Sequence, residues 1–206
     1  FDSRSRFQVE DFGFTDRNTL VDVDTKADFT WFANEHHTFE LGGHLKRHNM
    51  RLVQEFANME FEAFDISAWV PSVYIQDAWR PWPFLTIQPG VRASMFWAPE
   101  SDQRGTPNYG KTTSYTDVNP RLSMRYQMGD QTYLKASVGR FTQYVFRVPR
   151  EIQGISVFSD IWFTTDPSEE GGPQYSTHYI TGLETGFGDD IDFTAEVYYK
   201  DYDDIA

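Results

Sequence analysis

Apolar and polar residues alternate along several long segments of the chain. In Phe84–Trp97, one face carries Leu85, Ile87, Pro89, Val91, Ala93, Met95 and Trp97. The opposite face carries Thr86, Gln88, Gly90, Arg92, Ser94 and Phe96. The same alternation returns in Val21–Trp31, Asn119–Met128 and Ile191–Lys200. A period of two predicts β-strands that have one apolar and one polar face.

The length of these segments indicates what kind of sheet they form. Strands of soluble proteins typically run ~5–6 residues, whereas a tilted strand that crosses a membrane needs ~9–11. Phe84–Trp97 and Val21–Trp31 meet the longer requirement. Their polar faces are too charged for a soluble core, but they suit a water-filled or plug-filled lumen. We therefore predict an all-β fold, an antiparallel transmembrane β-barrel.

Short and long connections alternate between the expected strands. Turn-like sequences stand at Asn34–His36, Arg80–Pro83, Gly129–Asp130 and Gly188–Asp190. Longer polar stretches lie near Val53–Ser67, Ala98–Ser114 and Phe146–Ser176. Outer-membrane barrels have tight periplasmic turns and long extracellular loops. The four tight turns predict four hairpins and hence eight strands, with Phe1–Phe14 as a candidate ninth.

Aromatic residues gather near both ends of the expected strands, as the interfacial girdles of membrane barrels do. The set beside the short turns comprises Trp31, Phe32, Trp79, Trp82, Phe84 and Phe187. We expect it to form the periplasmic girdle. The set at the other end comprises Phe96, Trp97, Phe141, Tyr144, Tyr199 and Tyr202, which we expect to form the outer girdle.

Composition narrows the function classes. Only 39% of the residues are hydrophobic, the mean hydropathy is -0.57, and no apolar run approaches the ~20 residues of a membrane helix. Aromatic residues make up 17%, which a soluble aromatic-rich β-sandwich or sugar-binding module would also explain. The formal net charge of -13 argues against binding of nucleic acid. The absence of cysteine excludes disulfides and thiolate chemistry. The first residues are no signal peptide, so we expect a mature or internal segment.

Four strings resemble the barrel of TonB-dependent outer-membrane receptors. They are HHTFELGGHLKRH (His36–His48), YIQDAWRPWPFLTIQPGVR (Tyr74–Arg92), NPRLSMRYQMGDQTYLKASVGRFTQ (Asn119–Gln143) and STHYITGLETGFGDDIDFTAEVYYKDYDDI (Ser176–Ile205). Each motif alone is loose, but their order matches the family, and the resemblance covers about Thr19–Ile205. It implies a barrel of ~22 strands around a plug.

The chain also departs from that pattern. Eight or nine strands, no TonB-box-like start and no closing aromatic residue lead us to expect that residues 1–206 are a partial barrel domain without a plug domain. Because eight strands can close by themselves, a small OmpA-like barrel is the structural alternative.

The resemblance implies a receptor in the bacterial outer membrane that takes up a scarce nutrient, such as a siderophore, vitamin or oligosaccharide. Its expected partners are the lipid bilayer, the nutrient, and the TonB complex acting through a plug outside this chain. The alternatives are a passive or structural barrel of the OmpA or porin kind, without energy coupling, and a soluble extracellular β-rich binding module.

We weighed three groups of residues as possible chemical sites. His44 and His48 have a spacing that could bind zinc on a helix, but here they lie on an alternating strand with Lys46. The acidic residues Asp201, Asp203 and Asp204 lack the glycine and ligand spacing of a calcium loop. An acid–base pair among Glu184, Asp192 and Glu196 is less expected than pairing with Arg121, Arg125, Arg140 or plug residues.

No nucleophile, phosphate-binding or dinucleotide-binding motif is present, and Gly186–Gly188 indicates a hairpin. We therefore expect no enzyme, no catalytic residue, no cofactor and no metal. Substrate recognition is expected in the extracellular loops, because loops on a rigid scaffold carry function. The candidates for contacting the substrate are Tyr109, Tyr144, Phe146, Arg147, Trp162 and Tyr175, for which packing between loops is the alternative.

Overall fold

The computed structural model describes residues 2–9, 12–56, 59–100, 110–152, 155–164, 172–188 and 190–203. Regular structure in these ranges consists of β-strands alone. No helix in the described part is long and apolar enough to cross a membrane.

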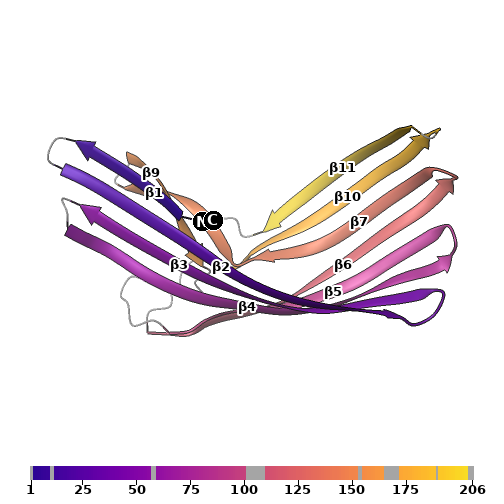
Figure 1. Cartoon of the computed structure of the whole chain (residues 1–206), viewed down its shortest axis with the longest axis horizontal. Coiled ribbons are helices and arrows are strands. Elements are labelled where there is room, and N and C mark those ends of the chain that lie inside the picture. The colour runs from indigo at the N-terminus through magenta and orange to yellow at the C-terminus, as the bar shows by residue number, and fades with distance from the viewer. Residues whose placement is uncertain are drawn as a thin grey trace.

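Nine of the described strands form one antiparallel sheet, a curved trough with β1 and β11 at its two edges (Figure 1). They are β1 (Asp2–Val9), β2 (Phe12–Phe32), β3 (His37–Phe56), β4 (Met59–Trp82), β5 (Leu85–Ala98), β6 (Thr113–Gly129), β7 (Thr132–Gln143), β10 (Gln174–Phe187) and β11 (Ile191–Asp203). Neighbours in the chain are neighbours in the sheet, except that β10 follows β7. The remaining two strands, β8 (Val145–Ile152) and β9 (Ile155–Thr164), pair with each other in a separate hairpin.

The predicted short turns are confirmed and gather at one end of the trough (Figure 1). After the β2–β3 turn, the Asn34 Oδ1 accepts hydrogen bonds from the backbone N–H groups of His36 and His37, at 2.8 and 3.0 Å. Gly188 has φ of 68°, a left-handed conformation that glycine adopts without strain. The candidate ninth strand is also present, because β1 pairs with the start of β2.

The aromatic residues expected beside the short turns are all exposed, between 39% and 77% of each residue's surface. Their rings contact one another: Trp82 and Phe84 stack with centroids 6.0 Å apart, and Phe84 meets Tyr126 edge-on at 5.8 Å. Exposed aromatic rings at a single level fit a membrane–water interface, where one part of the ring is apolar and another is wet.

The two predicted faces of the strands are confirmed on β5 and β6. On β5, Val91, Met95 and Trp97 are each 38% exposed, whereas the alternate positions Ser94 and Phe96 are buried. On β6, Leu122 is exposed and Asn119 is buried. We call the exposed apolar side the convex face and the opposite side the concave face.

Of the three expected long connections, the one at Val53–Ser67 is wrong, and the one at Phe146–Ser176 lies between β7 and β10 as expected but also forms strands. The stretch Val53–Ser67 belongs to β3 and β4, which continue far beyond the length that a membrane crossing needs. The stretch Phe146–Ser176 contains the β8–β9 hairpin. Short and long connections therefore do not alternate strictly. Polar residues in a strand that extends into water resemble a loop in the sequence, because neither face is required to be apolar there.

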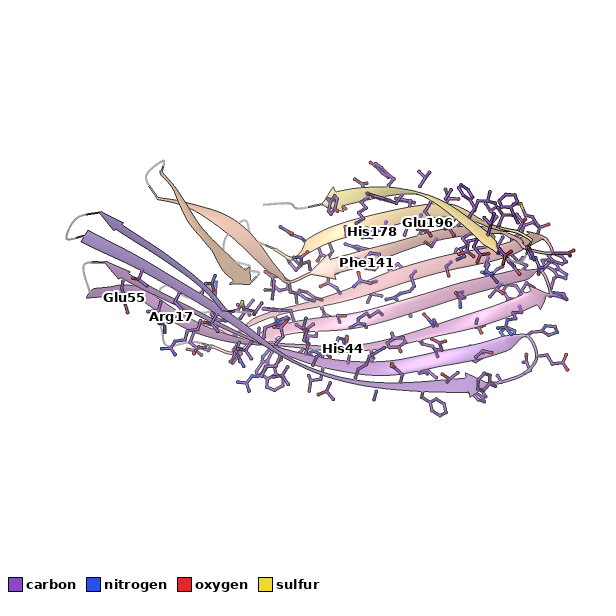
Figure 2. The ribbon with its side chains drawn as sticks, turned by 45° about the horizontal axis from the view of Figure 1, so that its top comes forward. Arg17, His44, Glu55, Phe141, His178 and Glu196 are labelled. Atoms are coloured by element: carbon purple, nitrogen blue, oxygen red, sulfur yellow. The ribbon has the colours of Figure 1, made fainter. Side chains whose placement is uncertain are left out.

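The expected outer girdle is wrong for three of its residues. Phe96 and Tyr144 are buried on the concave face, where their rings stack with centroids 5.4 Å apart. Phe141 also lies on that side, beside His178, with ring centroids 4.5 Å apart (Figure 2). Trp97, Tyr199 and Tyr202 are exposed. We predicted the outer girdle from proximity to the strand ends. However, successive residues of a strand face opposite sides of the sheet, so the position of each residue in this alternation decides its face.

Candidate functional site

The concave face has an apolar zone toward the long-strand end and a polar zone toward the short turns, and the boundary between them runs obliquely to the strand pairing, since His48 lies opposite Ala68. Toward the long-strand end it carries Leu20, Met50, Ile66, Ala68, Phe96 and Ala98, all buried. Toward the short turns the following residues on the same face are Asp22, His48, Ser72, Ser94 and Asp117. On β2 and β3 the zones are aligned, since Leu20 lies opposite Met50 and Asp22 lies opposite His48.

The apolar zone holds the start of the β8–β9 hairpin. Tyr144 is buried among Ala68, Phe96 and Ala98, and Val145 packs against both apolar clusters. Strand β9 also contacts β2. Burial of these side chains thus attaches the hairpin to the inside of the trough (Figure 1).

Asp117 lies at the boundary between the zones and accepts hydrogen bonds from two tyrosines. The hydroxyls of Tyr144 and Tyr175 donate to its Oδ2 and Oδ1, each at 2.8 Å. Tyr144 lies between β7 and β8. Burial raises the pKa of its hydroxyl well above the usual value, and the Asp117 carboxylate adds to the effect. The hydroxyl therefore remains a neutral donor at physiological pH.

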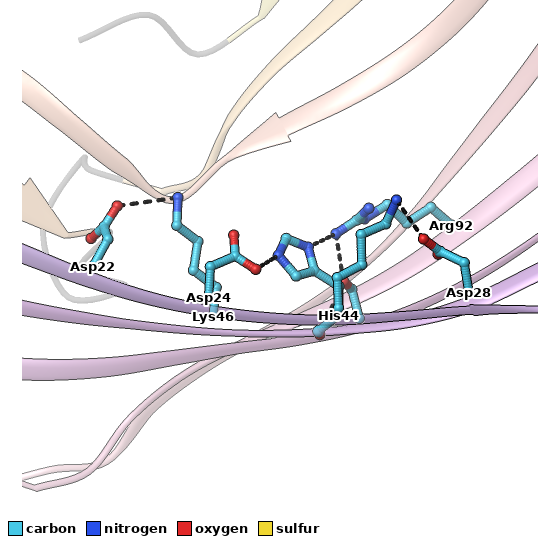
Figure 3. Close-up of polar contacts among 8 residues, drawn as sticks. Asp22, Asp24, Asp28, His44, Lys46 and Arg92 are labelled. Carbon is cyan, nitrogen blue, oxygen red and sulfur yellow. Dashed lines mark hydrogen bonds and ion pairs between the residues drawn. The ribbon is translucent and has the colours of Figure 1, made fainter.

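Between β2 and β3, carboxylates of the polar zone bind basic side chains. Asp22 accepts a hydrogen bond from His48 Nδ1 at 2.7 Å. It also pairs with Lys46 Nζ at 3.2 Å (Figure 3). Lys26 Nζ and Asp28 lie 2.9 Å apart. Screening by water makes exposed ion pairs such as Lys26–Asp28 weak. These pairs therefore neutralise charges on the lumenal side of the sheet but add little to its stability.

His44 bridges an acid and a base. Its Nε2 contacts Asp24, and its Nδ1 lies 2.8 Å from Arg92 Nη2 (Figure 3). Because a guanidinium can only donate, Nδ1 must accept and Nε2 must carry the proton that it donates to Asp24. Arg92 donates further to Ser72 Oγ at 2.5 Å and Ser94 Oγ at 3.3 Å.

Tyr74 crosses the backbone of β3 at Gly42. The Tyr74 hydroxyl donates to Asp28, and the three residues Asp28, Gly42 and Tyr74 lie opposite one another on β2, β3 and β4. A Cβ atom at Gly42 would lie 2.3 Å from Tyr74 Cε1 and 2.5 Å from Asp28 Oδ1. Glycine is therefore required for the ring to cover this strand.

The residues considered for chemistry have other partners in the structure. His44 and His48 bind different aspartates, as described above. Glu184 contacts Lys135 and lies 3.8 Å from Arg125, one of its expected partners. Arg125 also covers the Tyr133 ring at 3.6 Å. In the described ranges, no three His, Asp or Glu side chains come together in a way that could hold a metal ion.

The predicted substrate-contact residues are spread over several elements. Tyr144 and Tyr175 come together on Asp117, and Arg140 lies 4.4 Å above the Tyr175 ring. Phe146 and Arg147 lie on β8, and Trp162 lies opposite Arg147 on β9. Tyr109 lies outside the described residues. The prediction missed the network around His44 and Arg92, although the polar alternation placed both on the correct face.

Long antiparallel strands with an exposed apolar convex face, an aromatic belt and a polar concave face define an outer-membrane β-barrel wall. The family model of the TonB dependent receptor-like β-barrel matches residues 1–206. The chain belongs to this family, and its location is the bacterial outer membrane. Members of the family are transporters and not enzymes, which confirms the expectation that the chain is no enzyme. The concave face is thus the lumenal face.

Solved structures of the same family share the fold at low identity. The ferric yersiniabactin uptake receptor FyuA from Yersinia pestis is 15% identical to this chain, with a TM-score of 0.62. The match covers 99% of this chain and 32% of the FyuA chain. The ferric citrate transporter FecA is 12% identical, with a TM-score of 0.64, and the match covers 97% of this chain and 30% of the FecA chain. The copper transporter OprC is 14% identical, with a TM-score of 0.61, and the match covers 90% of this chain and 31% of the OprC chain. The chain spans about a third of the length of each. No curated protein matches it.

Proposed function

We propose that this chain is part of the wall of an outer-membrane receptor that takes up a scarce nutrient with TonB-coupled energy. The nutrient class remains that of the sequence prediction: a siderophore, a vitamin or an oligosaccharide. The observation that carries the proposal is the polar zone of the lumenal face. Its side chains are held at defined positions by neighbours on adjacent strands, as in the contacts of His44 with Asp24 and Arg92. A wall of this kind can contact a plug or a moving ligand without rearranging.

The proposal divides the work between this chain and the rest of the protein. Residues 1–206 supply the partial barrel domain, and a plug domain elsewhere in the protein receives energy from the TonB complex. Tyr109, Tyr144, Phe146, Arg147, Trp162 and Tyr175 remain the proposed contacts to substrate. The assembly of Tyr144 and Tyr175 on Asp117 supports a position for this group at the inner rim of the barrel.

Uptake by living cells tests this function. A strain that lacks the gene is grown with a single limiting nutrient at a time, and uptake of labelled iron chelates, cobalamin and oligosaccharides is compared with that of the parent. We expect the deletion to abolish uptake of one of them. Inactivation of TonB in the parent should have the same effect. Uptake that persists without TonB would show a passive barrel instead.

A further inference from the structure

One row of residues across the lumenal face places an arginine between two glycines. Cross-strand pairing aligns Gln76 with Gly90, Gly90 with Arg121, Arg121 with Gly139, and Gly139 with His178. The row thus crosses β4, β5, β6, β7 and β10. Both direct neighbours of Arg121 in this row lack a side chain, and the Arg121 side chain lies over the backbone of Gly90.

Arg121 and Gly139 line a hollow on the lumenal face, and Gly90 lies next to Arg121 in the same row. A Cβ atom at Gly90 would lie 2.9 Å from Gln76 Cβ and 3.1 Å from Arg121 Cγ. A Cβ atom at Gly139 would lie 3.3 Å from Phe141 Cε2 and 3.5 Å from Arg121 Cβ. Side chains that line the hollow include those of Gln76, Gln88, Ser123, Ser137, Phe141 and His178.

The positive charge in the hollow has no negative partner within the described part of the chain. No carboxylate there lies within ion-pair distance of Arg121. Arg92, on the next row, is close enough to interact with Arg121 and with Asp24. Its hydrogen bonds within the described residues go to two serine hydroxyls and His44. By contrast, Arg125 on the same strand and face lies 3.8 Å from Glu184. Within the described residues, Arg121 thus has no ion-pair partner, and the carboxylate on the same row, Glu40, is bound by the Gln76 amide.

We propose that the hollow at Arg121 binds a small oxyanion, specifically a carboxylate carried by the cargo during its passage through the lumen. This inference rests on the proposed function, because it requires the lumen to be a path for the cargo. The planar guanidinium of Arg121 matches the two oxygens of a carboxylate. Ser137 lies opposite Ser123 on the adjacent row. The Ser123 hydroxyl donates to Gln88 Oε1 at 3.1 Å, so the Ser137 hydroxyl is the second donor proposed for the anion. The Phe141–His178 ring pair supplies an apolar side for a planar organic group.

Binding of benzoate to the purified full-length protein in detergent micelles tests the site. Benzoate carries one carboxylate on a planar ring, and benzamide is its neutral counterpart of nearly the same shape. We expect the wild type to bind benzoate more tightly than benzamide. Arg121→Gln should weaken benzoate binding by about tenfold or more, since a hydrogen bond to a charged group is removed. Arg125→Gln is the matched control and should stay within about twofold.

A second variant tests the hollow without changing charge. Gly90→Ala places a methyl group against Gln76 and Arg121, and we expect it to weaken benzoate binding while Arg121 is retained. Heat-modifiable gel migration shows for every variant that the barrel is folded. Equal benzoate affinity of Arg121→Gln and Arg125→Gln would overturn the proposal.

A carboxylate of the protein itself is the competing occupant. In that case the wild type binds no benzoate, and Arg121→Gln lowers the thermal stability of the full-length protein; this result also overturns the proposal. The measurement needs no inner membrane, so its outcome is separate from that of the TonB-dependent uptake assay. Uptake that is unchanged by the gene deletion, together with intact benzoate binding, would refute the transport function and the cargo as the source of the carboxylate, but not the anion site itself.

Discussion

A charge placed on the convex face tests whether that face contacts lipid. Val91 lies midway along β5 between Phe84, in the aromatic belt beside the short turns, and Trp97, which is exposed near the other end. The midpoint between two interfacial aromatic residues is close to the centre of the bilayer. Val91 is 38% exposed on the convex face, so an arginine at this position would reach lipid.

The expected loss follows from that depth. An arginine on the lipid face of a barrel costs about 2–4 kcal/mol at the bilayer midplane and about 0–1 kcal/mol near the interfaces. For Val91→Arg we expect the midplane cost of about 2–4 kcal/mol. This cost lowers the folding equilibrium constant by a factor of about 30–1000. Urea titration of the full-length protein in lipid bilayers, followed by tryptophan fluorescence, measures this difference.

The matched control is Gln76→Arg. Gln76 lies one position from the row of Val91, because it follows Ile75, which lies opposite Val91, and itself lies opposite Gly90. Its amide donates to Glu40 at 2.6 Å on the lumenal face, so an arginine there would meet a carboxylate. We expect a change of at most about 1 kcal/mol. Equal destabilisation by the two variants, or none by Val91→Arg, would refute the assignment of the faces.

Two further variants examine the lumenal wall. Gly42→Ala forces the Tyr74 ring away from β3, and we expect a loss of about 1–3 kcal/mol in the same urea titration; Gly43→Ala meets no atom within 4 Å and should be tolerated. Tyr144→Phe removes a buried hydrogen bond to Asp117, which costs about 1–3 kcal/mol. Faster proteolysis of the β8–β9 hairpin in Tyr144→Phe would show that this bond anchors it, whereas unchanged proteolysis would contradict that role.

The sequence was sufficient to predict the faces of the central strands, the short turns and the family. Alternation with period two assigns parity, and parity places Val91 outside and Arg92 inside without knowledge of neighbouring strands. Turn residues such as Asn34 and Gly188 act locally, through a side-chain acceptor or a left-handed backbone. Each of these features depends on contacts within a few residues, which are visible in a single chain.

The apolar zone of the lumenal face could not be predicted in this way. Phe96 occupies a position of lumenal parity, and an aromatic residue near a strand end is also what a girdle would show. Its burial depends on Tyr144 and Val145, which follow it by almost fifty residues and reach it only through the packing of the sheet. Phe96 was therefore assigned to the outer girdle because its long-range contact with Tyr144 cannot be seen in the sequence. The period of two along the strand was assigned correctly.

The charge of the lumenal wall could not be predicted from the composition of the chain either. A formal net charge of -13 suggests an acidic lumen, yet the carboxylates of Asp22, Asp24 and Glu184 are each bound by a basic side chain or histidine. Other charges of the described wall lack a charged partner: Asp117 is bound by two tyrosine hydroxyls, and Arg121 has no ion pair. The position of Arg121 between two glycines results from register, because a shift of β6 by two residues against β5 and β7 would remove the glycines from its sides. Net charge is a sum over the chain, whereas recognition depends on which charges lack a partner, and strand pairing decides that.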